Sequence, residues 1–207
     1  MKINTIQIQN NGYISCKSSF YSSEDILQSG SNYTFVAGVN KLIGEIDSGN
    51  WAVSYLLSMY QHRPKDFVLF EAPNVLVNSG TVSLHELSKY SCYMDESYPL
   101  FSTKATVRKL VTNGLKKYPT NATPDDIKKM FFLDDQRFDR PLTGVGNEIF
   151  RSMAAIGYCH QKEIFCFPWF SNKRFEYYHK NMTYTLELLN NLGKVVVVPV
   201  GMPVSKT

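Results

Sequence analysis

Short apolar runs dominate the first 80 residues of the chain, and several of them alternate with polar positions. Alternation with a period of two, or a compact apolar run between turn residues, is typical of β-strands. Gly38 separates two of these runs and suggests a turn. The expected strands are Ile3–Ile8, Tyr33–Val36, Lys41–Ile43, Phe67–Phe70 and Asn74–Val77. Between them, Trp51–Tyr60 is apolar and free of breakers, which predicts a buried helix.

The pattern changes to a helical period in the middle of the chain. Thr123, Pro124 and the two acids after them predict a helix start, because Thr caps the free N–H groups and Pro fits the first turn. The later apolar runs read as buried strands around one long amphipathic helix that ends before Gly193. The expected elements are helices over Thr106–Lys116, from Thr123 to about Phe132, over Glu148–Tyr158 and over Asn172–Asn191, and strands over Ile164–Phe167 and Val195–Val200.

This order predicts an α/β domain with a parallel core and an inserted helical lobe. We expect one domain over residues 1–207, with an α/β core over 1–95 and 160–207 and a helical lobe over about 97–158. Aromatic residues make up 14% of the chain and charged residues 19%, a composition that excludes disorder and coiled coil. The net charge of +4 is too mild to indicate nucleic acid as a partner.

The cysteines and the N-terminus bear on location. Cys16, Cys92, Cys159 and Cys166 have no zinc or redox spacing and are expected to be buried thiols. The sequence predicts no signal peptide and no membrane span, and therefore a cytoplasmic protein. The four histidines show no ligand spacing, and no metal site is expected.

The segment Gly44–Trp51 follows a predicted strand and opens a predicted helix. Gly44 and Gly49 have the spacing of a phosphate-binding loop, in which backbone N–H groups and the helix N-terminus hold a phosphate. The lysine and the hydroxyl that such a loop needs are replaced by Asn50 and Trp51. Two glycines alone are also compatible with an ordinary strand–turn–helix corner.

Over nearly its whole length the chain resembles the ATP-binding cassette (ABC) ATPases of transporters. The resemblance rests on the Gly44–Trp51 loop, including Asp47, Ser48 and the two glycines, and on the order and spacing of other segments that match the family's motifs. It implies a P-loop NTPase-like core. Phe20–Leu27 includes Tyr21 at the position of the adenine-stacking aromatic, and Tyr93–Phe101 precedes the helical lobe. Asp139–Glu148 resembles the signature loop, with Gly144, Val145, Gly146 and Asn147 as the signature-like residues. Lys162–Ser171 lies at the Walker B position and Leu192–Gly201 at the switch position.

The same resemblance shows which catalytic groups are missing. Phe167 and Pro168 stand where the family has its metal-holding Asp and catalytic Glu, and Gly201 replaces the switch His. Asp95 and Glu96 lie near the Q-loop without a Gln, and Arg174 falls at the D-loop Asp. Phosphoryl transfer depends on such charged groups, and losing one preorganised group costs about 100-fold in rate or more.

Two classes of function follow from the resemblance. The first is an ATPase-deficient cassette that binds ATP weakly, without Mg²⁺, or acts as a structural partner of another ABC-type ATPase subunit and of a membrane transporter subunit. The alternative is a divergent, active ATP hydrolase, for which Asp95 and Glu96, with Asp47 and Asp134, are the candidate carboxylates. A different P-loop-like domain, such as a small kinase, fits the helical lobe less well. The apolar run Met130–Asp135, which ends in two acids, is interpreted as a helix end with solvated acids and not as a displaced metal site.

Overall fold

A computed structural model describes residues 2–17, 24–62, 67–101 and 104–202 of the chain. Its centre is a four-stranded sheet in which every neighbouring pair is parallel. The strand order is β5 (Gly38–Ile43), β11 (Val195–Val200), β10 (Ile164–Cys166) and β9 (Ser91–Tyr93). All six residues of β11 are buried, as the apolar run predicts for a strand covered on both faces.

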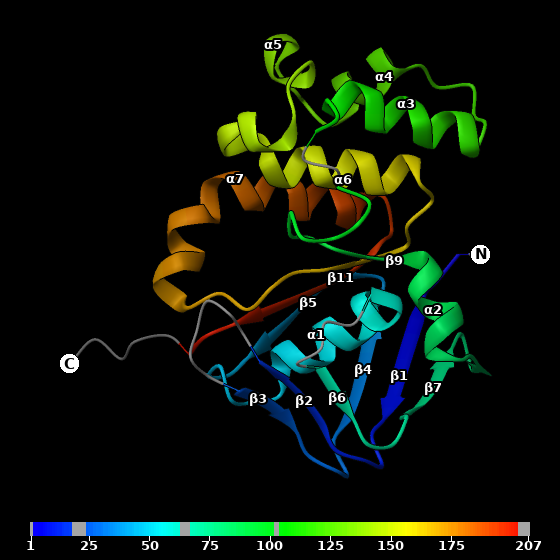
Figure 1. Cartoon of the computed structure of the whole chain (residues 1–207), viewed down its shortest axis with the longest axis vertical. Helices are drawn as coiled ribbons and strands as arrows, with labels where there is room; N and C mark the ends of the chain where they lie inside the picture. The colour runs from blue at the N-terminus through cyan, green and yellow to red at the C-terminus, as the bar shows by residue number, and fades with distance from the viewer. Residues whose placement is uncertain (1, 18–23, 63–66, 102–103, 203–207) are drawn as a thin grey trace.

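Antiparallel strands form a second layer below this sheet (Figure 1). One antiparallel sheet has the order β4 (Asn32–Val36), β1 (Thr5–Gln9), β7 (Asn74–Val77) and β8 (Gly80–Thr81). A three-stranded sheet joins β3 (Glu24–Leu27), β2 (Ile14–Lys17) and β6 (Phe67–Leu69). In β1, Ile6 and Ile8 are buried while Gln7 and Gln9 are exposed, which is the alternation read from the sequence.

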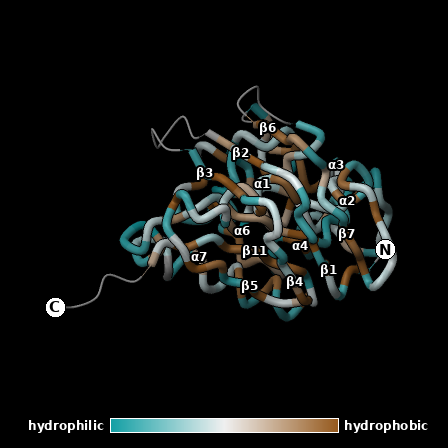
Figure 2. Tube along the Cα trace, turned by 90° about the horizontal axis from the view of Figure 1, so that it is seen from below, coloured by the Kyte–Doolittle hydropathy of each residue, from teal (hydrophilic) through white to brown (hydrophobic). Residues whose placement is uncertain are grey.

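Helix α1 (Asn50–Met59) lies between the layers, because it contacts both the parallel strands and the antiparallel strands β2 and β3. The 3₁₀ turn η1 (Tyr60–His62) and helix α2 (Leu84–Tyr90) follow it at one end. Helix α7 (Asn172–Asn191) packs on β5 and β11. Figure 2 shows the apolar part of the chain gathered inside these layers and the polar part outside.

The remaining helices stand together on the side away from the antiparallel layer (Figure 1). They are α3 (Val107–Lys117), α4 (Pro124–Met130), α5 (Asp135–Phe138) and α6 (Ile149–Cys159), with the 3₁₀ turns η2 (Leu142–Gly144) and η3 (Gly146–Glu148) before α6. Thr123 caps α4 in a capping box with Asp126, as its sequence predicts. Helix α6 connects this group to the rest, since it packs on both α3 and α7.

The structure corrects several expectations drawn from the sequence. Strands β2, β3 and β9 and helix α2 were not predicted. Gly38 is not a turn: its φ of 112° lies within the first residue of β5, which extends the strand toward the N-terminus. A Cβ on Gly38 would meet the side chain of Asn190 at 2.8 Å, which explains the glycine by close packing.

The acids of the Met130–Asp135 run are exposed, and Asp134 caps α5, as expected for solvated acids. In the described part of the chain no helix is both long and apolar enough to cross a membrane.

Candidate functional site

Four loops meet at one edge of the parallel sheet. Because β5, β9, β10 and β11 are parallel, the segments that follow them leave from the same, carboxyl, edge. These segments begin at Gly44, Met94, Phe167 and Gly201, which include the positions singled out in the sequence. In open α/β sheets this edge is where ligands bind.

The loop from Gly44 to Gly49 is held by its own side chains and by β3. Gly49 has a φ of 82°, and a Cβ there would lie 2.9 Å from the carbonyl oxygen of Ile26, so that only glycine fits. The side-chain nitrogen Nδ2 of the buried Asn50 lies 2.6 Å from the position that a Cβ on Gly44 would take. Ser48 Oγ donates to the carbonyl of Glu45 at 2.6 Å. The Asn50 side chain therefore lies across the loop, in contact with its first glycine.

A carboxylate from outside the loop occupies the N-terminus of α1. Asp25, on β3, is fully buried and accepts hydrogen bonds from the backbone N–H groups of Gly49 at 2.8 Å and Ala52 at 2.6 Å. The N–H of Trp51 contributes as well. Burial raises the pKa of Asp25 to about 6, with a further contribution from the negative charge of Asp47, while the backbone donors lower it. No motif in the sequence pointed to Asp25.

Trp51 turns its indole toward β9. Its Nε1–H donates to the hydroxyl of Tyr93 at 2.9 Å, and its ring meets the ring of Tyr55 edge-on. Tyr55 in turn contacts Tyr93 in a T-shaped pair with ring centroids 5.1 Å apart. The position at which a phosphate loop carries its metal-binding hydroxyl is thus part of an aromatic cluster that joins α1 to β9.

The Walker B-like segment belongs to the core. Phe167 is fully buried, its ring lies 5.6 Å from that of Phe150, and its carbonyl accepts a hydrogen bond from Ser54 Oγ at 2.6 Å. Trp169 Nε1 donates to the carbonyl of Gly44 at 3.1 Å. The aromatic residues of this segment, Phe165, Phe167, Trp169 and Phe170, are all buried. Since residues 164–171 contain no carboxylate, a shift of one position in the comparison with the cassettes would not supply one.

The remaining candidate residues form no charged cluster at this edge. Asp95 accepts hydrogen bonds from the backbone N–H and the hydroxyl of Ser97 at 2.9 and 2.6 Å, a local turn, and Glu96 is exposed. Arg174 lies in the first turn of α7, with its guanidinium over the ring of Tyr178. Within the described residues no group of His, Cys, Asp or Glu could hold a metal ion. Tyr21 lies outside the described residues.

The signature-like residues form tight turns before α6. Gly144 and Gly146, in η2 and η3, are exposed, as is Asn147, whereas Val145 is buried. Gly146 has a φ of 57°, and a Cβ on it would touch no other atom of the described chain. The residue that follows Asn147, Glu148, anchors the turn from inside: its carboxylate is 3.4 Å from Arg137 and 3.3 Å from Arg151, and it accepts the N–H of Asp134 at 3.1 Å.

We expect Glu148→Gln to lower the free energy of unfolding by about 2 kcal/mol, because a buried carboxylate loses its charge beside two arginines that remain. Urea denaturation followed by circular dichroism measures this change. Glu187→Gln on α7 is the control for removing a glutamate charge, and it should be neutral. An equally neutral Glu148→Gln would show that the arginines do not depend on this carboxylate.

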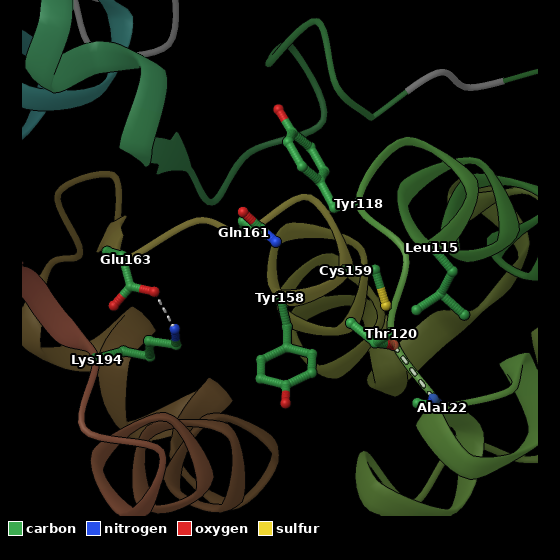
Figure 3. Close-up of a pocket in the computed structure, with 9 residues that line it drawn as sticks. All are labelled: Leu115, Tyr118, Thr120, Ala122, Tyr158, Cys159, Gln161, Glu163 and Lys194. Atoms are coloured by element: carbon green, nitrogen blue, oxygen red, sulfur yellow. Dashed lines mark hydrogen bonds and ion pairs between the residues drawn. The ribbon is translucent and has the colours of Figure 1, made fainter. Parts of the chain in front are cut away.

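A separate cavity of about 310 Å³ lies at the amino edge of the sheet (Figure 3). Tyr158 points into it from α6, and Lys194 pairs with Glu163 on its wall at 2.6 Å. Both partners of the pair stand directly before β11 and β10. The cavity is therefore not part of the site at the carboxyl edge.

Comparisons with known proteins place the fold. No family model and no curated protein matches the sequence. Solved structures match it closely in shape: a putative ABC transporter ATP-binding protein from Pyrococcus furiosus has a TM-score of 0.61 at 14% identity, over 98% of this chain and 94% of its own. The ATP-binding cassette MJ0796, in a dimeric post-hydrolysis state with ADP and phosphate, has a TM-score of 0.60 at 13% identity, over 96% and 88%. A bacterial Atm1-family ABC exporter with ATP bound has a TM-score of 0.56 at 14% identity, over 97% of this chain and 34% of its own.

The chain therefore has the fold of the ATP-binding cassette ATPases, here with helices packed on a parallel sheet and a separate antiparallel layer. At 13–14% identity the likeness concerns the fold and leaves the activity to be argued from the site.

Proposed function

We propose that this protein is an ATPase-deficient ABC-type cassette that serves as a structural partner subunit. The observation that carries the proposal is the chemistry of the carboxyl edge of the sheet. At the places where the resemblance calls for a cation, a metal ligand and a histidine, the edge carries Asn50, Phe167 and Gly201. None of these side chains carries a charge that could neutralise a transferring phosphoryl group, and Phe167 and Gly201 have no side-chain group that could hold a metal ion or position a water molecule.

The partner in this proposal is another ABC-type ATPase subunit. Cassettes pair head to tail, as the resemblance implies, so that a signature loop faces the phosphate loop of the other subunit. The exposed turn at Gly144–Asn147 would complete an active site in such a partner. MJ0796 is described as dimeric, which supports a pair of cassettes. A membrane transporter subunit, with this chain at the cytoplasmic face, is the second proposed partner.

The test is phosphate release from Mg-ATP by the purified chain, measured beside ATP binding. We expect no release above the background of a buffer control, because several charged groups are replaced together. Turnover that disappears in Asp95→Asn or Glu96→Gln would establish the alternative, a divergent active ATPase. Turnover that survives both substitutions would come from Asp47, from Asp134 or from a contaminating enzyme. A contaminant is recognised when the activity does not follow the protein peak across the fractions of a sizing column.

A partial restoration of the phosphate loop tests whether the loop retains its shape. We expect the double variant Asn50→Lys with Trp51→Ser to bind ATP at least about tenfold more tightly than the wild type, since a lysine and a hydroxyl return to the motif. Isothermal titration calorimetry measures the gain. Asn113→Lys, which adds the same charge at an exposed position on α3, is the matched control. An unchanged affinity in the folded double variant would mean that a lysine and a hydroxyl at these two positions do not make the loop a phosphate site.

A further inference from the structure

Asp25 uses the same kind of donor that a bound phosphate would use. Its two carboxylate oxygens accept from Gly49 and Ala52, at the end of the loop and in the first turn of α1. The N-terminus of a helix attracts anions because its first N–H groups lack partners within the helix and carry partial positive charge. In this chain the anion is supplied by its own strand β3.

Two physical effects of this carboxylate oppose the binding of a phosphate at the same N–H groups. An N–H group makes one good hydrogen bond at a time, so donors bonded at 2.6–2.8 Å to Asp25 are not available to another anion. The ionised carboxylate would also repel a phosphate brought within a few ångströms of it in a buried setting. Both effects weaken phosphate binding in addition to the loss of the lysine and the hydroxyl at Asn50 and Trp51.

The packing fixes Asp25 in this position. β3 lies directly under the loop, since a Cβ on Gly49 would strike the backbone of Ile26 and Leu27. Asp25 is fully buried and pairs in register with Cys16 of β2. The other titratable groups that influence it or respond to its charge are Asp47 on the loop, Cys16 on β2 and Tyr33 on β4.

We propose that Asp25 is an internal anion that occupies the phosphate-binding amides at the start of α1 and so keeps this loop closed to nucleotide phosphates. The carboxylate makes the site self-occupied: the chain provides the negative charge that the loop would otherwise take from a ligand. This inference rests on the proposed function in one respect, that the Gly44–Gly49 loop corresponds to a phosphate loop. It adds a residue that would weaken the binding of nucleotide phosphates at this loop.

The experiment compares the binding of pyrophosphate, without metal, to the full chain and its variants by isothermal titration calorimetry at pH 7.5. We expect Asp25→Ala to bind pyrophosphate at least about tenfold more tightly than the wild type, because three amides become free and one negative charge is removed. Glu24→Gln is the matched control: it removes an acidic charge from the neighbouring position of β3, where the Glu24 carboxylate accepts a hydrogen bond from Ser15 on β2. Its affinity should equal that of the wild type.

A folded Asp25→Ala variant that binds no better than the wild type would overturn the inference. An equal gain in Glu24→Gln would also overturn it, since the effect would then come from net charge alone. If Asp25→Ala does not fold, Asp25→Asn and the wild type at pH 5.5 take its place, with sulfate as the probe because its charge is constant over this range. At pH 7.5, sulfate should bind more tightly to Asp25→Asn than to the wild type. The wild type should bind sulfate more tightly at pH 5.5 than at pH 7.5. The absence of both gains contradicts the inference. Phosphate release from Mg-ATP by the wild type would remove the proposed function but would leave these binding comparisons valid.

Discussion

Phe167→Asp, which returns an acid to the Walker B-like position, should destabilise the protein by about 4 kcal/mol or more instead of creating a metal site. Phe167 is fully buried and its ring packs against those of Phe150 and Phe170. The substitution removes a large apolar side chain from the core and places a carboxylate there without a partner. Urea denaturation measured by circular dichroism and tryptophan fluorescence gives the free energy of unfolding.

Phe167→Leu is the control that separates lost volume from buried charge. It keeps an apolar side chain and should cost about 1.5 kcal/mol. An Asp variant as stable as the Leu variant, in particular one that gains stability with Mg²⁺, would contradict this expectation and would show that the end of β10 opens to solvent. The predicted result means that apolar packing fills this position, so that a single acid there does not form a metal site.

The apolar packing at this edge explains which of its elements could be predicted from the sequence. The apolar runs at Ile164–Phe167 and Val195–Val200 predicted buried strands, and both lie in the centre of the parallel sheet. Such runs signal burial by themselves, without reference to distant residues. The helices α1, α3, α4, α6 and α7 were predicted within a residue or two for a similar reason, since caps and helical periods are local.

The elements that the sequence did not predict lack such local signals. Strand β3 has the sequence Glu24-Asp25-Ile26-Leu27, in which two acids are poor strand formers, and it is a strand because β2 pairs with it. Strand β9 is only three residues long and follows directly after α2. Both depend on tertiary partners, which override weak local preference.

The contacts that close the candidate site were missed for the same reason. Asp25 meets Gly49 across 24 residues of chain, Trp51 meets Tyr93 across 42, and Trp169 meets Gly44 across 125. The loop could be located from its two glycines and the flanking pattern. What fills it could not, because a buried Asp in a short strand gives no sign in the sequence of the amides that it will face.

The stability of the protein should depend on pH through Asp25, and the sign of this dependence tests which force governs the carboxylate. Burial raises its pKa from 3.8 to about 6 against the opposing effect of the α1 amides. A group with a raised pKa in the folded state binds its proton more tightly there than in the unfolded chain. Its contribution to stability is therefore complete below pH 3.8, falls as the pH rises, and levels off above about pH 6.

We expect the free energy of unfolding of the wild type, relative to that of Asp25→Asn, to fall by about 2.5 kcal/mol between pH 4 and pH 8. The Asn variant has no titration at this position, so the difference cancels the other groups. Cys16 and Tyr33 do not disturb it, because the pKa of each is raised above its ordinary value and both stay neutral in this range. Asp47→Asn, which removes the charge that adds to the pKa shift of Asp25, should move the transition to lower pH. A difference that instead grows with pH would mean that the N–H groups of Gly49, Trp51 and Ala52 outweigh burial, and that Asp25 is held as a fully ionised anion down to pH 4.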